Sequence, residues 1–512
     1  MLRYPVYALG AATAAAVLAL MPLSQAQAQN KNVTIVLTDE PTDVDGCDTS
    51  QSTVGRVALQ NFYETLTMMD PDTGQLTPLL ATSWEQITPD SKGWRFHLRN
   101  GVKYHDGQPF TAQGIVKTIQ RNQNPAVSPA CGNRTKFFGL DKFTFKTPDD
   151  YTLEIYTEKP EPILPIRLSQ MTLQAPGASE ASLTRTAVGT GPYKFVNWVP
   201  GLEINVVRNE DYWGKKPEVA GAKYVWRKES AVRAAMVKIG EADLTDNIAV
   251  QDALDPTLDH SYLNTETSFL RIDSTRKPLD DKRVRLAITY AIDREALKGL
   301  VSKDALLATQ VIIPTIPGHN HELDKRPYKF DLAKAKQLLA EAKAAGVDIS
   351  KEIEIQGRVN IWQNATEMME AVQQMLKAAG LNVKLVMYDR APWLELLNRP
   401  HDENRGPTLL QGQHDNNFGD AVFSVPTRYK CEGSQSFTCD KDLEELADKA
   451  AATPAPERYK LYEEVFRRIH DDIIADVLLY HMIGYTRVNP RIVFKPNPSL
   501  NAMIPLARIS FK

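Results

Sequence analysis

Two segments in the second half of the chain each place one charged side chain after a predicted strand. Arg358 lies in segment 357–364 and Asp415 lies in segment 413–420. In open α/β sheets, ligands bind outside the carboxyl ends of the strands, where loops carry polar groups. A guanidinium binds a carboxylate through two charge-assisted hydrogen bonds, and a carboxylate binds an amine. One fixed cation and one fixed anion would suit a zwitterionic solute.

Neighbouring side chains extend this candidate site. Aromatic rings stack on solutes, although Trp393 at a predicted helix start is expected to pack in the core. The predicted ligand-binding residues are Arg358, Asp415, Asn416, Trp362, His414 and Gln413.

A β-α-β unit positions both segments. Residues 352–356 alternate apolar and polar side chains as a strand, 365–379 have helical apolar spacing and end at Gly380, and 382–387 form a second strand. Such a unit predicts parallel strands with a right-handed crossover. A strand at 408–410 is expected to lead into an irregular polar loop at 411–420.

The first half of the chain reads as a series of hairpins. Residues 94–98 alternate as a strand, and a turn at 100–101 predicts a hairpin that continues through 102–104. Further hairpins are predicted at 144–157 and 193–207.

Helices are predicted between these hairpins. Thr111 is an N-cap before apolar residues with helical spacing. Residues 55–68 have helix-like spacing with core aromatic rings, and a helix at 229–238 is expected to bury Val232 and Ile239. Near residue 271 the pattern changes to alternating helices and strands, so a domain boundary is expected there.

Length and charge limit the function classes. The 512 residues allow two or three domains, and 43% hydrophobic residues indicate a globular protein. Removal of residues 1–28 takes away Arg3 alone and leaves 59 basic against 63 acidic residues. This near-neutral balance argues against a nucleic-acid partner, because phosphates require a basic face.

The N-terminus has the features of a secretion signal. Arg3 precedes an apolar run at 8–20, and Ala26 to Ala28 form a small-x-small cleavage site. We predict a signal peptide at 1–28; an uncleaved anchor is the alternative. Because no cysteine lies at the cleavage point, the mature chain is expected in the periplasm of a Gram-negative envelope, without a lipid anchor.

Four cysteines in an exported chain allow three disulfide pairings. Cys431 and Cys439 are close enough in sequence to form a small loop, which leaves Cys47 with Cys131. We therefore predict Cys47–Cys131 and Cys431–Cys439. Zinc is the competing interpretation, but paired C-x-x-C spacing is absent.

Other motifs give little support for metal or catalysis. His319 and His321 stand two residues apart without a second helical pair, so no metal ligand and no cofactor is predicted. The sequence contains no G-x-S-x-G, H-E-x-x-H or Walker motif, so we do not predict an enzyme.

One long stretch resembles a known family. Residues 78–125 contain PLLATSW, FHLRNGVKYHDGQPFTA and the helix after them. They resemble the corresponding segment of periplasmic solute-binding proteins that serve peptide-type ABC importers, family 5, whose ligands include dipeptides, oligopeptides and nickel. The resemblance continues at 189–193 (GTGPY), 209–214 (NEDYWG) and 277–284 (KPLDDKRV).

The resemblance implies an α/β, two-lobed periplasmic binding protein fold with a hinge, mixed sheets and an extra α+β subdomain in the first lobe. Lobe I would comprise 29–275 and 483–512, with the subdomain at about 57–187, and lobe II would comprise 276–482. A monomer would close on a small-molecule or peptide ligand and deliver it to an ABC permease in the inner membrane.

The resemblance also suggests residue roles. Arg358 falls where dipeptide binders hold a ligand carboxylate. Residues 411–420 take the place of the family's GW--D--DPD segment, whose aspartate receives an amino group, but Gln413 replaces the tryptophan and Ala421 the proline. The resemblance implies that Asp415 or Asn416 has this role. If it is Asn416, an amine loses its countercharge, and an opine, a sugar conjugate or another polar metabolite becomes the better ligand. A metal-chelate or haem carrier on the same scaffold and a secreted hydrolase remain the alternatives.

Overall fold

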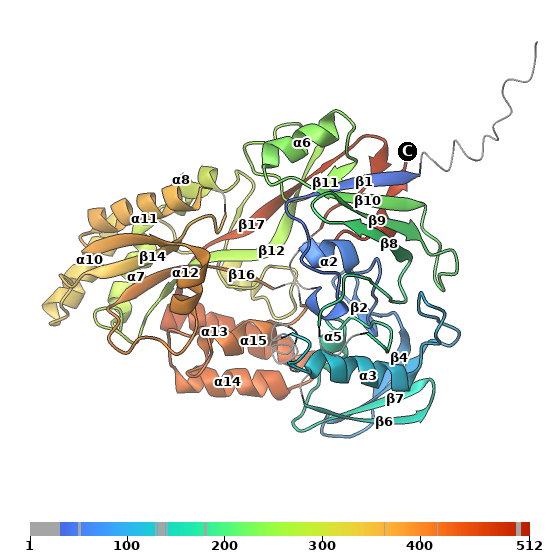
Figure 1. The fold of residues 1–512 in the computed structure, drawn as a ribbon. Coiled ribbons are helices and arrows are strands. Elements are labelled where there is room, and N and C mark those ends of the chain that lie inside the picture. The colour runs from blue at the N-terminus through green and yellow to red at the C-terminus, as the bar shows by residue number, and fades with distance from the viewer. Residues whose placement is uncertain are drawn as a thin grey trace, which may run out of the picture.

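One mixed sheet of eleven strands runs through most of the molecule (Figure 1). The computed structural model describes residues 31–49, 53–128, 131, 139, 142–178, 182–362, 364–416, 418–497 and 503–512. The predicted signal peptide lies outside these residues. The strands, in spatial order, are β15 (Val383–Tyr388), β14 (Ile353–Arg358), β16 (Thr408–Asp415), β12 (Asp259–Ile272), β17 (Asp476–Val488), β11 (Leu244–Thr245), β1 (Asn32–Leu37), β10 (Gly221–Trp226), β9 (Glu203–Arg208) and β8 (Tyr193–Val199), with β13 (Leu306–Leu307) also paired to β17.

Two long strands, β12 and β17, connect the two halves of this sheet. They pair antiparallel, and one end of the pair lies beside β11 while the other lies beside β16. Figure 1 shows them passing from the β1 half to the β14 half. Their register shifts between Leu263 and Thr267 and again before Phe269, so the ladder is interrupted where the two halves meet.

The β14 half contains the predicted β-α-β unit. Strands β14 and β15 are parallel, as predicted, and α11 connects them. Asp281 and Asp331 cap α7 and α10 through their side chains, as their sequence positions suggest. The helices of this half are α7 (Lys282–Ala291), α8 (Arg294–Leu297), α9 (His321–Asp324), α10 (Leu332–Ala344), α11 (Ala365–Ala379), α12 (Arg390–Leu397), α13 (Val425–Tyr429), α14 (Lys441–Ala452) and α15 (Glu457–Arg468), and a π-helical turn follows at Ile469–Ile473.

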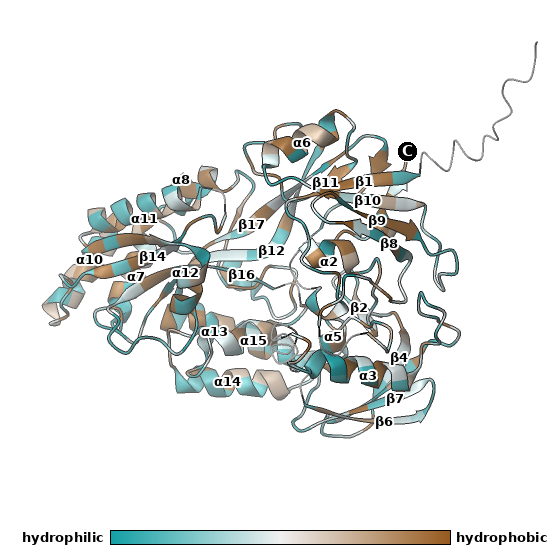
Figure 2. Cartoon of the chain, in the orientation of Figure 1, coloured by the Kyte–Doolittle hydropathy of each residue, from teal (hydrophilic) through white to brown (hydrophobic). Residues whose placement is uncertain are grey.

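Two apolar cores cover opposite faces of this half. Helices α7, α10 and α11 pack Val284, Leu338 and Met368 against one face. Helices α14 and α15 pack Leu443 and Phe466 against the other. Figure 2 shows brown along β17 and alternating teal and brown on α11 and α14, as expected for helices with one buried side.

The β1 half carries a separate subdomain. A four-stranded antiparallel sheet, β4-β5-β7-β6, packs with α3 around its own core, which includes Phe96 and Ile115. Thr111 caps α3 by accepting a hydrogen bond from the Gly114 amide, as predicted. The remaining elements are β2 (Thr67–Met69), β3 (Leu76–Pro78), β4 (Ala81–Gln86), β5 (Gly93–Leu98), β6 (Phe143–Asp149), β7 (Thr152–Thr157), β18 (Ile492–Val493), β19 (Ser510–Phe511), α2 (Thr53–Ala58), α3 (Ala112–Gln123), α5 (Leu164–Leu168) and α6 (Ser230–Lys238).

The C-terminal segment returns to the β1 half. Ile504, Leu506 and Ile509 are buried in the same core as Ile35 of β1. The N-terminal strand and the C-terminal tail therefore stabilise one unit, as the sequence suggested. The exact lobe limits, 29–275 with 483–512 and 276–482, stay a prediction.

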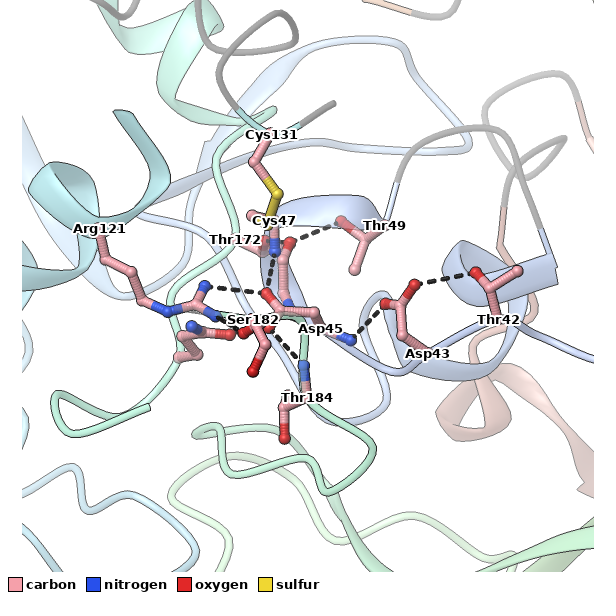
Figure 3. Close-up of a disulfide and its surroundings, with 12 residues drawn as sticks. Thr42, Asp43, Asp45, Cys47, Thr49, Arg121, Cys131, Thr172, Ser182 and Thr184 are labelled. Atoms are coloured by element: carbon pink, nitrogen blue, oxygen red, sulfur yellow. Dashed lines mark hydrogen bonds and ion pairs between the residues drawn. A yellow bond between two sulfur atoms is a disulfide. The ribbon is translucent and has the colours of Figure 1, made fainter. Parts of the chain in front are cut away.

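Both predicted disulfides are present. Cys47 pairs with Cys131 and Cys431 with Cys439, with Cα–Cα distances of 5.4 and 4.3 Å. Figure 3 shows the first beside a buried ion pair in which Arg121 donates to both carboxylate oxygens of Asp45, at 3.0 and 2.7 Å. The Cys47 amide also donates to Asp45. The ion pair attaches the segment after β1 to α3, and the disulfide attaches it to Cys131, which follows α3 in the chain.

Two local predictions in the first half are wrong. Strand β5 does not form a hairpin with 102–104. It pairs with the preceding strand β4 and the distant strand β7 instead, because these two strands complete a sheet that buries Phe96. The helix predicted at 55–68 ends at Ala58. Gln60 has a left-handed backbone with φ of 62°, which ends the helix and carries Phe62 and Tyr63 into the core.

Helix α6 exposes the side that its apolar pattern suggested would be buried. Val232 and Ile239 are 42% and 68% exposed, whereas Ala234, Val237 and the Arg233 side chain are buried. The Arg233 guanidinium donates to the backbone carbonyls of Arg227, Lys228 and Asn247. These bonds fix the rotation of a short helix more strongly than its apolar side chains do.

Candidate functional site

The β12–β16 ladder places Glu266 directly opposite Asp415. Residues 411–415, predicted as loop, belong to β16, because β12 supplies a full antiparallel partner for them. Asn264 Nδ2 donates to Glu266 Oε2 at 3.0 Å, and the Gln413 side chain also bonds the Glu266 carboxyl group. Two carboxyl groups therefore lie side by side at the end of β16.

Burial and the neighbouring carboxylate change the protonation of Glu266. Loss of solvent and the charge of Asp415 raise the pKa of Glu266 to about 7. Near neutral pH the Glu266 carboxyl group is therefore only partly ionised. A cationic group brought beside it would favour the fully ionised form.

A second charged pair comes from the other half of the molecule. Arg56 of α2 forms an ion pair with Asp246, which follows β11. Arg56 and Glu266 are close enough to interact electrostatically. The Glu266 carboxyl group therefore lies where side chains of both halves meet.

A hollow of about 260 Å³ lies at the same junction. Its walls come from both halves: the β2–β3 turn with Met69 and Gly74, the tail with Asn497, residues 313–317, and Thr265 of β12. The Thr265 carbonyl accepts from the Asn416 amide at 3.1 Å, and Thr265 Oγ1 is buried without a hydrogen-bond partner among the described residues. Thr265 thus connects a wall of the hollow to the residue that follows β16.

Arg358 is the last residue of β14. Its Cζ lies 5.3 Å from the centre of the Trp393 ring, and the Trp393 indole donates to the Gln411 carbonyl at 3.0 Å. Burial, together with the nearby Arg390 charge, lowers the pKa of Arg358. Arg358 Nε is buried without a hydrogen-bond partner among the described residues, so a donor is available there.

Arg358 and Asp415 are not in contact. The β14–β16 register pairs Gln356 with Leu410, so Arg358 is level with Gly412 and three residues short of Asp415. At ~3.3 Å per residue this offset is about 10 Å along the strand. Because side chains alternate, Arg358 shares the face of Trp393 and Asp415 points to the opposite face. A solute that contacts both must lie across the strand ends.

The other predicted ligand residues divide into two groups. Gln413 shares the face of Asp415 and contacts Glu266. His414 and Asn416 are buried, and their Nε2 and Nδ2 atoms each lie 2.6 Å from Ser424 Oγ. Burial, with Arg428 and Arg271 nearby, lowers the pKa of His414 far below its usual value. These two side chains position the turn after β16.

Trp362 lies apart from these groups. It is half-buried and packs on the core under α11, and its indole Nε1 lacks a hydrogen-bond partner among the described residues. Its location therefore favours a role in core packing, with the indole N–H left as a free hydrogen-bond donor.

Arg428 is a buried cation that the sequence did not indicate. It is 8% exposed, and its Nε and Nη1 atoms have no hydrogen-bond partner among the described residues. Burial and the charge of Arg271 lower its pKa to about 9. Its charge also interacts electrostatically with Asp415. No motif around VPTRY in the sequence signals this role.

A larger hollow lies far from these residues. It measures about 750 Å³ and is bordered by Lys343, Lys377 and Asn382 at the amino ends of β14 and β15. Ligand sites in such sheets lie at the carboxyl ends, so its size alone does not make it the site.

A family model described as bacterial extracellular solute-binding proteins, family 5 middle, matches residues 75–435. The chain is 28% identical over 462 residues to a dipeptide-binding protein of Escherichia coli K12, which covers 82% of this chain and 84% of that protein. It is 26% identical over 470 residues to heme-binding protein A of Haemophilus influenzae, with 85% and 84% covered.

Solved structures show the same fold. HbpA2 from Haemophilus parasuis superposes with a TM-score of 0.82 at 22% identity, and covers 94% of this chain and 100% of that one. DppA from Helicobacter pylori, in complex with the peptide STSA, superposes with a TM-score of 0.75 at 22% identity, over 95% and 99%. The two-lobed architecture predicted from the sequence is confirmed.

Proposed function

Because the chain belongs to the bacterial extracellular solute-binding proteins of family 5, we propose that it captures a small peptide or a similar zwitterion between its lobes and delivers it to an ABC permease. Members of this family are the solute-binding components of ABC importers. The observation that carries the ligand class is the carboxyl pair of Glu266 and Asp415 at the junction of the two halves.

In this proposal the ligand amine binds the carboxyl pair. Asp415 and Glu266 provide the countercharge, and Gln413 orients Glu266. Arg358, with a free Nε, receives the ligand carboxylate. The offset of about 10 Å between the two strand positions matches a peptide of two or three residues, since each extended residue spans at most ~3.6 Å. His414 and Asn416 hold the turn after β16 in place, and Trp362, apart from these anchors, offers the ligand its indole N–H.

Cellular location and assembly complete the proposal. Residues 1–28 are a cleaved signal peptide, and the mature protein works as a periplasmic monomer. Within the described part of the chain, no helix has the length and apolarity needed to cross a bilayer. The family's role in solute binding supports a protein that leaves its ligand chemically unchanged.

Calorimetry with a peptide panel tests this function. Untagged mature protein is titrated with di- and tripeptides, with their N-acetylated forms and with their C-terminal amides. We expect binding of free peptides and a large loss when either end is blocked. Equal affinity for free and blocked peptides would contradict recognition of both ends.

The same carboxyl pair gives a second candidate, a hydrolase. A carboxyl group with a pKa near 7 beside a second carboxyl group is an arrangement that acid–base catalysis uses. Overnight incubation with the bound peptide, followed by mass spectrometry, distinguishes the two. Intact peptide supports a binding protein. More cleaved peptide than protein, counted in moles, supports the hydrolase.

A haem carrier is the third candidate, and similarity to heme-binding protein A favours it. Titration with haemin, followed by visible absorption, tests this candidate directly. A shift of the Soret band that added peptide does not reverse would favour a haem ligand over a peptide ligand.

A further inference from the structure

His319, His321 and Asp324 bring three metal-ligand types together on the β14 half. One ligand atom from each lies within 4.8 Å of the others. His319 Nε2 is 2.9 Å and His321 Nδ1 is 3.4 Å from the same atom, Asp324 Oδ2. The two rings lie 4.8 Å apart between centres. Two imidazoles therefore converge on a single carboxylate oxygen.

The surrounding bonds hold the ligand atoms in place. His319 is 3% exposed, and its Nδ1 lies 3.1 Å from the Ile312 carbonyl. A carbonyl only accepts, so Nδ1 carries a proton and Nε2 is the atom that faces Asp324. Thr309 Oγ1 donates to Asp324 Oδ1 at 2.7 Å, which leaves Oδ2 toward the histidines. Metal-binding histidines and carboxylates are oriented by such outer bonds.

The segment that carries these residues is itself closely bonded. Gln310 and Asn320 exchange two hydrogen bonds of 3.0 Å, between Gln310 Nε2 and the Asn320 carbonyl and between the Asn320 amide and Gln310 Oε1. Asn320 also caps α9. The ligand geometry is thus set before any ion binds.

The local charge also suits a cation. Asp324 supplies a carboxylate whose hydrogen-bond partners are Thr309 and His319. His481 lies behind His319, with ring centres 6.1 Å apart, and its Nε2 is buried without a partner among the described residues. Lys325 is paired with Glu322.

We propose that His319, His321 and Asp324 form a binding site for a divalent transition-metal ion such as Zn²⁺. Two imidazole nitrogens and one carboxylate oxygen are a donor set that Zn²⁺, Ni²⁺ and Cu²⁺ accept, with at least one position left for water. His321 is 66% exposed along its side chain, which gives an ion direct access.

In the ion-free protein His319 Nε2 and Asp324 Oδ2 lie 2.9 Å apart. An ion bound by both atoms would replace this direct contact. The site lies two residues beyond Pro317, a wall of the inter-lobe hollow. A bound ion would therefore stiffen one wall of that hollow.

Zinc titration of the untagged, chelator-treated protein tests the proposal. We expect calorimetry to show binding of one Zn²⁺ per chain. Because His321 is exposed, His321→Ala should fold normally and bind Zn²⁺ at least tenfold more weakly. Asp324→Asn should lose binding similarly, and Mg²⁺ should give no signal.

His260 provides the matched control, since it is an exposed histidine on β12. His260→Ala should bind Zn²⁺ like the wild type. X-ray absorption of the zinc-loaded protein should show two imidazole ligands, and one in His321→Ala. Equal zinc affinity of wild type and His321→Ala would overturn the proposal, as would the absence of micromolar binding by the wild type.

Discussion

Asp420 and Arg458 form a two-pronged ion pair in which neither side chain is exposed to solvent. Arg458 Nε and Nη2 donate to the two Asp420 carboxylate oxygens at 2.8 and 2.7 Å. Arg458 also donates to the Ala450 and Ala451 carbonyls at the end of α14. The polar turn after β16 is thus attached to α14 and α15 through one guanidinium.

Removing one partner of this pair should destabilise the protein strongly. Asp420→Ala leaves a buried guanidinium without its countercharge, so the free energy of unfolding should fall by about 3–5 kcal/mol. Urea denaturation measures this. The exposed pair of Lys142 and Glu158 is the control, and Glu158→Ala should leave the denaturation midpoint nearly unchanged. Equal effects of the two substitutions would show that the buried pair contributes little.

Arg358 should contribute to ligand affinity through its charge. In Arg358→Ala the affinity for the identified peptide should fall about 10- to 100-fold, as expected for loss of about 1.5–3 kcal/mol from a charge-assisted hydrogen bond. Arg390→Ala is the matched control, because Arg390 is a nearby exposed arginine. Calorimetry compares the two variants. An unchanged affinity in Arg358→Ala would remove this residue from the site.

Ligand affinity should depend on pH through Glu266. Its carboxyl group, with a pKa of about 7, is protonated below neutral pH and attracts an amine less well. Affinity for a free peptide should therefore rise from pH 5.5 to about 7.5 and then level off. In Glu266→Gln the affinity should be lower and nearly independent of pH over this range. The same slope in both proteins would place the titrating group elsewhere.

Glu64 should give a separate pH dependence of stability. It is buried and accepts hydrogen bonds from Thr190, Tyr212 and Trp213, and burial raises its pKa to about 7. Its neutral form is favoured in the folded state. Its contribution to stability is therefore fully present below pH 4.5 and is lost as the pH rises toward 7.

Glu64→Gln isolates this contribution. As the pH rises from 4.5 to 7, the free energy of unfolding of the wild type should fall relative to that of Glu64→Gln, by about 3 kcal/mol at most. Urea denaturation at several pH values measures it. A difference that does not vary with pH would mean that the charge of Glu64 is compensated.

The two disulfides should differ in their effect on stability. They close loops with sequence separations of 84 and 8 residues. In the loop-entropy model, loss of Cys47–Cys131 costs about 4–5 kcal/mol and loss of Cys431–Cys439 about 2–3 kcal/mol. Paired Cys→Ser variants, compared by thermal unfolding, test this order. The reverse order would show that loop entropy is not the main contribution.

Local signals predicted many of the elements correctly. Caps at Thr111, Asp281 and Asp331 marked helix starts, because a side-chain acceptor at the first amides depends on neighbouring residues alone. The parallel pair β14 and β15 followed from the spacing of one unit. Both disulfides followed from the short separation of two cysteines.

Elements that depend on distant partners were less predictable. Residues 411–415 looked like loop because their side chains are polar, but β12 pairs with them across more than 140 residues. Strand β5 likewise joined β7 instead of the nearest segment. The β-propensity of a segment does not indicate which distant strand will pair with it.

The candidate site was predicted in part. Arg358 and Asp415 lie at strand ends, as the sequence suggested, whereas Glu266 was missed. Glu266 alternates with buried Thr265 and Thr267 on β12, and only its pairing with Asp415 gives it a role. The signal that could have indicated Glu266 is its position as a carboxylate within a strand that becomes apolar after it.

The interrupted ladder between β12 and β17 has a mechanical consequence. Glu266 lies within the interval between Leu263 and Thr267, where the register shifts. Where β12 lacks regular bonds to β17, it bends more easily than on either side, although it stays paired with β16 from Glu266 onward. Separation of the two halves would then rotate this carboxylate out of its enclosed setting, so the flexible point of the molecule would also sense whether a cationic guest is present.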